Sequence, residues 1–425
     1  MVGAPALYQT GTHLARAYWM QGLNANPFPA SKLGLLAAKV YEQCDAKDGD
    51  IAPSPCLDRF IVSRAPPTSR SRCPGFSALM RVICGYILVW WLAEPNDTTI
   101  PGAGLMMSSR RVLITGAAGN LGSRLARRLA GDVELVRAMI HRRPLPDALA
   151  FTPAVEAAQA DLARPETLPR CLDGVDTIVH FAGVLFRARP ERFLPQTNIG
   201  WFSNLLDAAL AARISRVILI SFPHVEGPTT REHPATERLD GQPISVHART
   251  RLEEERILYE RTRGTQTTPV VLRSATVYGK GILMVEAARR LARLRLLGVW
   301  REPTCYHFLQ IDDFLDAAAA AVVNEAVRGT YGLGDEQPVT IQEFLDGATR
   351  VWGLPHPWRL PWWVILAAAT ASEAFAGTFG TVAPLTRDFV RLGRVPHCCD
   401  TRRMRAELLP QLKYPTFAAG KETLR

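Results

Sequence analysis

The sequence predicts an α/β protein built on an open, doubly wound parallel sheet. From residue 110 onward, short apolar strands alternate with amphipathic helices, the order in which crossover helices join parallel strands. The first strand runs into three glycines spaced three apart, Gly116, Gly119 and Gly122, and a helix follows at once. After about residue 275 the strict alternation ends, so we expect a smaller lobe there.

The individual elements follow from composition and period. Runs rich in β-branched and apolar residues predict strands at 111–115, 135–140, 176–180, 216–221 and 269–273. Apolar residues three and four apart predict helices at 121–130, 198–212, 247–262, 283–297 and 312–324. Thr340 is the expected N-cap of a later helix. We therefore divide the chain into an extension (1–107), a core (108–280) and a region that is mainly substrate lobe and C-terminal helices (281–425).

Residues 1–107 differ from the rest of the chain. They are rich in Pro, Ser, Cys and Trp and show no sustained period, and Met106 and Met107 stand just before the first strand. We predict a poorly ordered extension, or a translation start that lies at one of these two methionines. A small helical appendage that docks on the main domain is the alternative.

Composition limits the classes of partner. The 425 residues are 47% hydrophobic and 21% charged, which is typical of globular proteins, and the net charge is +10. The arginines are scattered over separate helix faces, so we expect no nucleic acid. None of the eight cysteines has Cys-x-x-Cys spacing, so we expect reduced thiols and no metal site. No signal peptide is recognisable, and the apolar runs at 82–93 and 362–371 are short for a membrane span. These features favour a cytoplasmic protein without a membrane partner.

The glycine-rich turn predicts a dinucleotide site. Gly116 permits a tight turn, Gly119 removes a Cβ where a pyrophosphate approaches the backbone, and Gly122 lets the helix pack close to the strand. The helix then begins with Asn120 and Leu121. Its N-terminus offers free N–H groups and the positive end of the helix dipole to the phosphates. A purely structural tight turn is the alternative.

The end of the second strand bears on the choice of cofactor. An acid there binds the ribose 2′-OH of NAD, whereas an arginine accommodates the 2′-phosphate of NADP. The strand is followed by His141, Arg142 and Arg143, with no carboxylate among them. We therefore expect a preference for NADP(H), with NAD(H) as the alternative cofactor. An exposed basic loop without a role in binding is the other interpretation.

Several motifs in order resemble one known family. Residues 115–122 resemble a TGxxGxxG fingerprint, residues 272–279 an LRPxxVYG element and residues 307–313 an xFVHVDD element. Together they resemble the extended short-chain dehydrogenases/reductases, the NAD-dependent epimerase/dehydratase family, over about residues 110–415. The resemblance implies a Rossmann fold and an NAD(P) cofactor. It also implies that Asp161 and Leu162 touch the adenine, and that the turn of Phe181, Ala182 and Gly183 lies beneath the nicotinamide ribose.

The catalytic signature departs from that family, which carries Tyr-x-x-x-Lys on a helix and a Ser or Thr at the end of strand four. His247 occupies the Tyr position, Arg251 the Lys position and Phe222 the hydroxyl position. Histidine transfers protons near neutral pH without help from a lysine, and Arg251 can still bind ribose hydroxyls. The missing hydroxyl would come from Ser221, with His224 and Thr276 as alternatives.

These observations leave three functions open. The first is an NAD(P)-dependent oxidoreductase or epimerase acting on a carbonyl or secondary alcohol of a small molecule, such as a sugar nucleotide or a sterol- or lipid-like compound. The second is a catalytically inactive NAD(P)-binding structural or regulatory protein resembling the complex I accessory subunit. The third is a sterol or lipid dehydrogenase at a membrane surface, motivated by the Trp- and Arg-rich stretch 358–363. Family members pair through the helices matching 198–212 and 247–262, so a homodimer is one oligomeric state to test.

Overall fold

A seven-stranded parallel sheet forms the centre of the structure, a computed structural model that describes residues 108–183, 189–379, 383 and 385–425. The strand order is β11-β6-β5-β4-β1-β2-β3, and every neighbouring pair is parallel. This order confirms the predicted doubly wound fold. The strands are β1 (Ser108–Thr115), β2 (Val133–Ile140), β3 (Val155–Gln159), β4 (Thr177–His180), β5 (Arg216–Ser221), β6 (Thr268–Ser274) and β11 (Gly329–Leu333).

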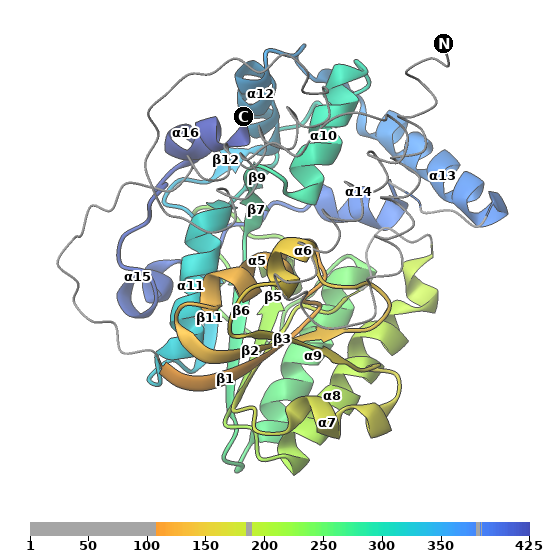
Figure 1. Ribbon diagram of the computed structural model, residues 1–425. Helices are drawn as coiled ribbons and strands as arrows, with labels where there is room; N and C mark the ends of the chain where they lie inside the picture. The colour runs from red at the N-terminus through yellow and green to blue at the C-terminus, as the bar shows by residue number, and fades with distance from the viewer. Residues whose placement is uncertain (1–107, 184–188, 380–382, 384) are drawn as a thin grey trace, which may run out of the picture. The chain divides into compact units, whose positions relative to one another are not determined.

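Helices cover both faces of this sheet. Helices α7 (Pro169–Leu172), α8 (Trp201–Ala211) and α9 (Val246–Thr262) lie along one side, and α5 (Asn120–Leu129) and α11 (Ile311–Val323) lie along the other (Figure 1). Side chains of β1 alternate between the two cores. Val112 and Ile114 pack with the α5 and α11 side chains, whereas Leu113 packs with those of α8 and α9. Because both faces are buried, the central strands read as continuous apolar runs.

Two strands of the sheet were absent from the sequence prediction. The edge strand β3 is mostly exposed and carries few β-branched residues, and β11 contains two glycines. Strand β11 lies beyond residue 280, yet it pairs with β6 and completes the sheet. Region 281–425 therefore contributes to the core as well as to the lobe. The prediction for residues 1–107 lies outside the described residues.

The smaller lobe is built from short strands and helices in the upper part of Figure 1. Its strand pairs join β7 (Thr276–Tyr278) to β10 (Phe308–Gln310), β8 (Gly298–Trp300) to β13 (Trp358–Leu360) and β9 (Cys305–Tyr306) to β12 (Val339–Thr340). Its helices are α10 (Leu283–Arg293), α12 (Ile341–Trp352), α13 (Trp362–Phe379) and α14 (Arg387–Gly393). The short helices α6 (Asp147–Ala150), α15 (Arg402–Glu407) and α16 (Phe417–Gly420) complete the described chain.

The predicted cap of α12 is confirmed. The Thr340 hydroxyl accepts a hydrogen bond from the Glu343 N–H at 3.1 Å, and the Glu343 carboxylate accepts one from the Thr340 N–H at 2.7 Å. This reciprocal pair is a capping box, which satisfies two N–H groups at the helix start. The cap fixes where α12 begins after β12.

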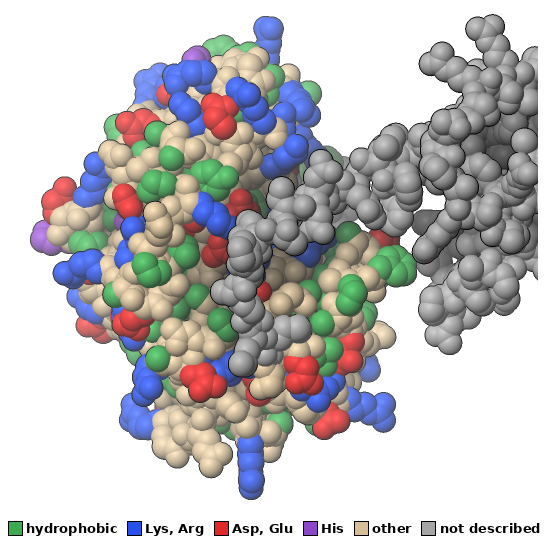
Figure 2. Space-filling model, turned by 60° about the vertical axis from the view of Figure 1, so that its left-hand side comes forward, with side chains coloured by type: hydrophobic (Ala, Val, Ile, Leu, Met, Phe, Trp, Pro, Cys, Tyr) green, Lys and Arg blue, Asp and Glu red, His purple; other side chains and the backbone are tan. Residues whose placement is uncertain are grey.

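The surface of the lobe carries exposed apolar side chains. Leu294 follows α10, Trp363 and Phe375 project from α13, and each is at least 60% exposed. In the view of Figure 2, Lys and Arg side chains are interspersed with Asp and Glu. Within the described ranges, no helix is both long and apolar enough to cross a membrane.

Candidate active site

The glycine turn has the backbone shape that a pyrophosphate needs. Gly116 has a φ of +70°, a left-handed conformation that side chains disfavour. A Cβ on Gly122 would lie 2.5 Å from the Gly116 carbonyl oxygen, and one on Gly119 would lie 2.9 Å from the same atom. No side chain caps the N-terminus of α5, so its first N–H groups face outward for a ligand. The turn therefore fits a dinucleotide.

Asn120 and Leu121 hold this turn against its surroundings. The Asn120 side-chain amide donates to the Gly281 carbonyl at 2.8 Å, and Leu121 packs against the hydrophobic core. Arg124, one turn further along α5, donates to the Lys280 carbonyl at 3.0 Å. The side chain of Asn120 thus anchors the loop after β7, which leaves its backbone N–H for a phosphate oxygen.

A carboxylate reaches the end of β2 from another strand. His141 Nε2 lies 3.4 Å from Asp161 Oδ2, on the loop after β3. Arg142 and Arg143 are exposed, and neither forms an ion pair with another described residue. Leu162 is buried, and its carbonyl accepts a hydrogen bond from Asn204 at 2.9 Å. The residues predicted to bind adenine and ribose therefore lie at one edge of the sheet, where the two arginines are exposed.

Thr115 ties the β4 turn to the end of β1. Its hydroxyl lies 2.9 Å from His180 Nδ1 and accepts from the Ala182 N–H at 3.3 Å. The Phe181 N–H donates to the Thr115 carbonyl at 3.3 Å. Burial, with a smaller contribution from Arg251, lowers the pKa of His180 to about 3. His180 is therefore neutral and holds the turn by hydrogen bonding.

Helix α9 brings Arg251 over this turn. The helix begins at a Ser245 cap, whose hydroxyl accepts from the Ala248 N–H at 3.1 Å. Arg251 Nη2 would lie 3.4 Å from a Cβ placed on Gly183, so the guanidinium covers the exposed backbone there. Arg251 Nη1 lies 2.8 Å from the buried Glu254 carboxylate. Burial raises the pKa of Glu254 to about 7, although Arg251 opposes this shift.

His247 forms a buried pair with an acid from the lobe. Its Nδ1 lies 2.6 Å from Asp388 Oδ2, and the other oxygen of Asp388 accepts from the Val246 N–H at 3.0 Å. Burial alone would raise the pKa of Asp388, but the hydrogen bonds from His247 and Val246 lower it below its usual value. An ionised acceptor places the imidazole hydrogen on Nδ1. His247 is only 7% exposed, and its Nε2 has no hydrogen-bond partner among the described residues.

The surroundings of this pair include a polar amide and a cavity. Asn198 lies in a π-helical turn, Pro195–Gly200, and its amide donates to the Thr250 hydroxyl of α9 at 3.0 Å. Such irregular turns are frequent at functional sites. A cavity of about 170 Å³ lies against Asp388 and is also lined by Arg189 and Arg391. Asp388, on the lobe side of the pair, therefore borders space that a small group can enter.

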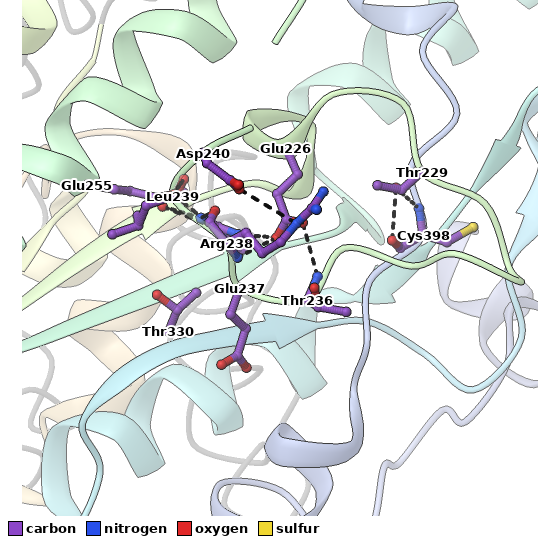
Figure 3. Close-up of polar contacts among 12 residues, drawn as sticks. Glu226, Thr229, Thr236, Glu237, Arg238, Leu239, Asp240, Glu255, Thr330 and Cys398 are labelled. Carbon is purple, nitrogen blue, oxygen red and sulfur yellow. Dashed lines mark hydrogen bonds and ion pairs between the residues drawn. The ribbon is translucent and has the colours of Figure 1, made fainter. Parts of the chain in front are cut away.

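Ser221, the residue expected to supply the missing hydroxyl, lies against a buried carboxylate. Its hydroxyl donates to the Glu255 carboxylate, which binds the buried Arg273 guanidinium at 2.6 Å. Arg273 also binds Glu226, whose carboxylate accepts from the Arg238 N–H at 3.0 Å (Figure 3). The structure thus places Ser221 in a buried ion network.

His224 and Thr276, the alternative sources of the hydroxyl function, meet around a third residue. The rings of His224 and His397 have centroids 4.0 Å apart, and the Thr276 hydroxyl lies 3.2 Å from His397 Nε2. Burial lowers the pKa of His224 to about 3. These neutral side chains form a polar cluster of their own beside Phe222, whose ring packs on His224.

Asp388 is the site residue that the sequence analysis missed. It lies 141 residues after His247 and outside every recognised motif. The only local signal is Thr386, which caps α14 and so predicts that a helix begins there. Nothing in the sequence indicates that this helix packs against α9.

The comparison with protein families decides the class of the chain. A family model described as the NAD dependent epimerase/dehydratase family matches residues 112–334, a range that contains the glycine turn, the β4 turn and α9. The chain belongs to the NAD dependent epimerase/dehydratase family. The predicted resemblance is thereby confirmed, and by family the chain is an NAD-dependent oxidoreductase or epimerase of small molecules.

Relatives within this family differ in how much of the chain they match. The ceramide reductase of Caulobacter vibrioides is 27% identical over 274 residues, which is 64% of this chain and 80% of the relative. A 3 beta-hydroxysteroid dehydrogenase/Delta 5-->4-isomerase of Mycobacterium tuberculosis is 25% identical over 67% of this chain and 80% of its own length. The uronate dehydrogenase of Pseudomonas syringae pv. tomato is 36% identical, but over only 28% of this chain and 41% of its own length.

Solved structures of this family share the fold. The UDP-glucuronic acid 4-epimerase of Bacillus cereus, solved with UDP-glucuronic acid and NAD, superposes with a TM-score of 0.59 at 18% identity. The match covers 74% of this chain and 97% of that one. A dTDP-glucose 4,6-dehydratase of Streptomyces venezuelae, solved with NAD, has the same TM-score at 20% identity. At these identities the likeness shows the fold alone.

Proposed function

We propose that this family member is an NADP(H)-dependent oxidoreductase that acts on a carbonyl or secondary alcohol of a lipid-like molecule, with His247 as its proton-transfer group. The observation that carries the proposal is the buried His247–Asp388 pair, with Nδ1 and Oδ2 2.6 Å apart, at the position of the family's tyrosine. An imidazole held at one nitrogen by a carboxylate is a common arrangement for acid–base catalysis.

Each residue of the site has a definite role in this proposal. A bound nicotinamide supplies or accepts the hydride. His247 Nε2 gives a proton to the substrate oxygen during reduction and removes it during oxidation. Asp388 fixes the orientation of the ring and stabilises the imidazolium. Arg251 lies over the Gly183 backbone and binds the ribose hydroxyls of the cofactor, a role that the lysine has in the family.

The NADP(H) preference rests on the open basic edge at the end of β2. Arg142 and Arg143 are exposed and lack acidic partners among the described residues, so both are available to a 2′-phosphate. Asp161 brings a carboxylate to this edge, where it lies 3.4 Å from His141.

A lipid-like substrate is supported by two kinds of observation. The relatives that match most of the chain are named for ceramide and 3β-hydroxysteroid substrates, whereas the uronate dehydrogenase matches only a short part. The lobe also exposes Leu294, Trp363 and Phe375, each at least 60%. Exposed apolar side chains of this size suit contact with an amphipathic molecule.

A non-catalytic binding protein is the second candidate function. The observation that favours it is Phe222, which occupies the position of the family's hydroxyl, while Ser221 is engaged by Glu255. Such a protein would keep the cofactor cradle and lack turnover.

Two measurements, made one after the other, distinguish these functions. Fluorescence titration with NADPH and NADH gives the two affinities. A panel containing a ceramide, a 3β-hydroxysteroid and a 2-alkyl-3-oxoalkanoate is then followed by nicotinamide absorbance. Turnover of a panel member supports the oxidoreductase. Tight NADPH binding without turnover in either direction supports the binding protein.

A further inference from the structure

Two thiols meet in the lobe, outside the residues that the proposed function uses. Cys305 lies on β9 and Cys398 lies in the segment after α14, and their Sγ atoms are 3.7 Å apart. Both are free cysteines. Cys398 is buried at 1% exposure, whereas Cys305 is partly exposed. One thiol is thus accessible to a reagent and the other is protected behind it.

The backbone holds the two thiols in this position. The His397 N–H donates to the Cys305 carbonyl at 3.0 Å, and the His307 N–H donates to the His397 carbonyl at 2.8 Å. On the other side, the Thr229 hydroxyl accepts from the Cys398 N–H at 2.9 Å and donates to its carbonyl at 3.0 Å. Figure 3 shows both contacts, with the Cys398 sulfur directed away from Thr229. The approach of the sulfurs is therefore set by paired chain segments.

The charge around Cys305 favours its thiolate. The Cys398 thiol donates a hydrogen bond to Cys305, and the Arg231 guanidinium interacts with the same sulfur. These contacts outweigh partial burial and lower the pKa of Cys305 to about 6. The thiolate is the form that reacts with oxidants and electrophiles. The hydrogen bond that the Cys398 thiol donates, together with burial, raises the pKa of Cys398 above its usual value.

We propose that Cys305 and Cys398 form a reversible dithiol–disulfide site that hydroperoxides oxidise. The Cys305 thiolate attacks the peroxide, the O–O bond breaks, and a sulfenic acid forms as the released hydroxide takes a proton. The Cys398 sulfur then attacks the Cys305 sulfur, the S–O bond breaks, and water leaves as the disulfide forms. In sum, two thiols and one hydrogen peroxide give one disulfide and two waters, whereas an organic hydroperoxide leaves one alcohol and one water. A dithiol reductant reverses the change by exchange.

The neighbouring groups favour this pairing over other chemistry. Cys399 turns toward His307 Nδ1 at 3.3 Å and the Leu333 carbonyl at 3.6 Å, away from Cys305. In the part of the chain that the structure describes, no three His, Cys, Asp or Glu side chains are arranged to hold a metal ion. A disulfide needs the sulfurs to close to about 2.05 Å, which is a side-chain movement of under about 2 Å. It would close a loop between positions 93 residues apart.

The test uses the reduced full chain, titrated with hydrogen peroxide and mapped by peptide mass spectrometry without reduction. We expect a Cys305–Cys398 disulfide, reversed by dithiothreitol, together with a higher melting temperature because the unfolded chain is constrained. Cys398→Ser should leave Cys305 trapped as a sulfenic acid that dimedone labels, whereas Cys171→Ser should leave the disulfide unchanged. A different disulfide partner for Cys305, or no disulfide after stoichiometric peroxide, would overturn the proposal.

Arg231 provides an independent readout that does not depend on cysteine variants. Arg231→Ala should slow iodoacetamide alkylation of Cys305 at pH 7 by about twofold, because the thiolate loses its cation and a smaller fraction of the thiol is ionised. The exposed Arg170 on α7 serves as the matched control, and Arg170→Ala should leave the rate unchanged. Equal alkylation rates in the wild-type and Arg231→Ala proteins would contradict the role given to this arginine.

Discussion

In the proposed function the glycine turn and helix α9 bind the same cofactor, but they follow the family pattern to different degrees. The turn keeps all three glycines in place, and each of them is required by the backbone geometry. Helix α9 keeps the spacing of the catalytic pair but replaces both residues, with His247 and Arg251 in place of the tyrosine and lysine. The cofactor-binding half of the proposed site therefore follows the family pattern, and its proposed catalytic half departs from that pattern.

The difference follows from what each region contributes. Phosphate binding uses backbone N–H groups and the absence of Cβ atoms, which almost no other residue can replace. Proton transfer requires only a group of suitable acidity in the right place. In the proposed function, His247 meets this requirement through Asp388, whose Oδ2 lies 2.6 Å from His247 Nδ1.

The largest expected effect concerns the glycine turn. Gly119→Val should abolish NADPH binding, because the new side chain would meet the Gly116 carbonyl, 2.9 Å from the Cβ, and fill the pyrophosphate position. Fluorescence titration measures the loss. Gly131→Ala is the matched control, since a Cβ there meets nothing within 4 Å. Unchanged NADPH affinity in a folded Gly119→Val protein would remove the turn from the site.

Next in size is the effect of the carboxylate behind His247. Asp388→Asn should lower kcat by about tenfold to 10⁴-fold with little change in NADPH affinity, because the imidazole loses its orientation and its counter-charge. Steady-state kinetics on a substrate from the panel measures kcat. Asp207→Asn, which alters an exposed acid on α8, should have no such effect. Wild-type kcat in Asp388→Asn would show that the pair has only a structural role.

An intermediate effect on NADPH affinity is expected from the two arginines that follow β2. Arg142→Ala combined with Arg143→Ala should weaken NADPH binding by about ten- to a hundredfold, the cost of losing a charge-assisted hydrogen bond, and leave NADH binding nearly unchanged. Titrations with both cofactors measure the ratio. Arg170→Ala should change neither affinity. If NADH binds the wild-type protein more tightly than NADPH does, the proposed preference is wrong.

The smallest expected effect is on the pH dependence of stability, and it comes from His224 in the buried polar cluster. The pKa of His224 is lowered to about 3 by burial, against about 6.5 in an unfolded chain. Above pH 6.5 neither state is protonated there. Below it only the unfolded state gains the proton, so His224 removes about 1.4 kcal/mol of stability per pH unit down to about pH 3.

Between pH 6.5 and 5 the free energy of unfolding of His224→Gln should therefore fall less steeply than that of the wild type, by about 1.4 kcal/mol per pH unit. Denaturant unfolding at each pH measures both slopes. His233→Gln is the control, because His233 is exposed. Parallel stability curves for wild-type and His224→Gln proteins would mean that His224 takes up protons in the folded state.

Local patterns explain what could be predicted from the sequence. The central strands β1, β2, β4, β5 and β6 contribute apolar side chains to both cores, and the glycines stand three residues apart at one turn, so both are visible along the chain. The edge strand β3 lacks this signal because one of its sides is unpaired and mostly exposed. Strand β11 lacks it because Gly329 and Gly332 interrupt the apolar run.

Tertiary contacts explain what could not be predicted. Asp388 reaches His247 only through the packing of α14 on α9, and Asp161 reaches His141 only because β3 pairs with β2. Ser221 faces the Arg273 network because Glu255, on α9, lies within hydrogen-bond reach. In each case the residue type was visible in the sequence, but its partner was fixed by the fold.

The most direct test of the account is the turnover of His247→Ala with saturating NADPH and a substrate from the panel. We predict a kcat lower by about 10²–10⁴-fold, because the proton must then come from water, while the NADPH dissociation constant changes little. Full activity in a folded His247→Ala protein would contradict the assignment of proton transfer to His247.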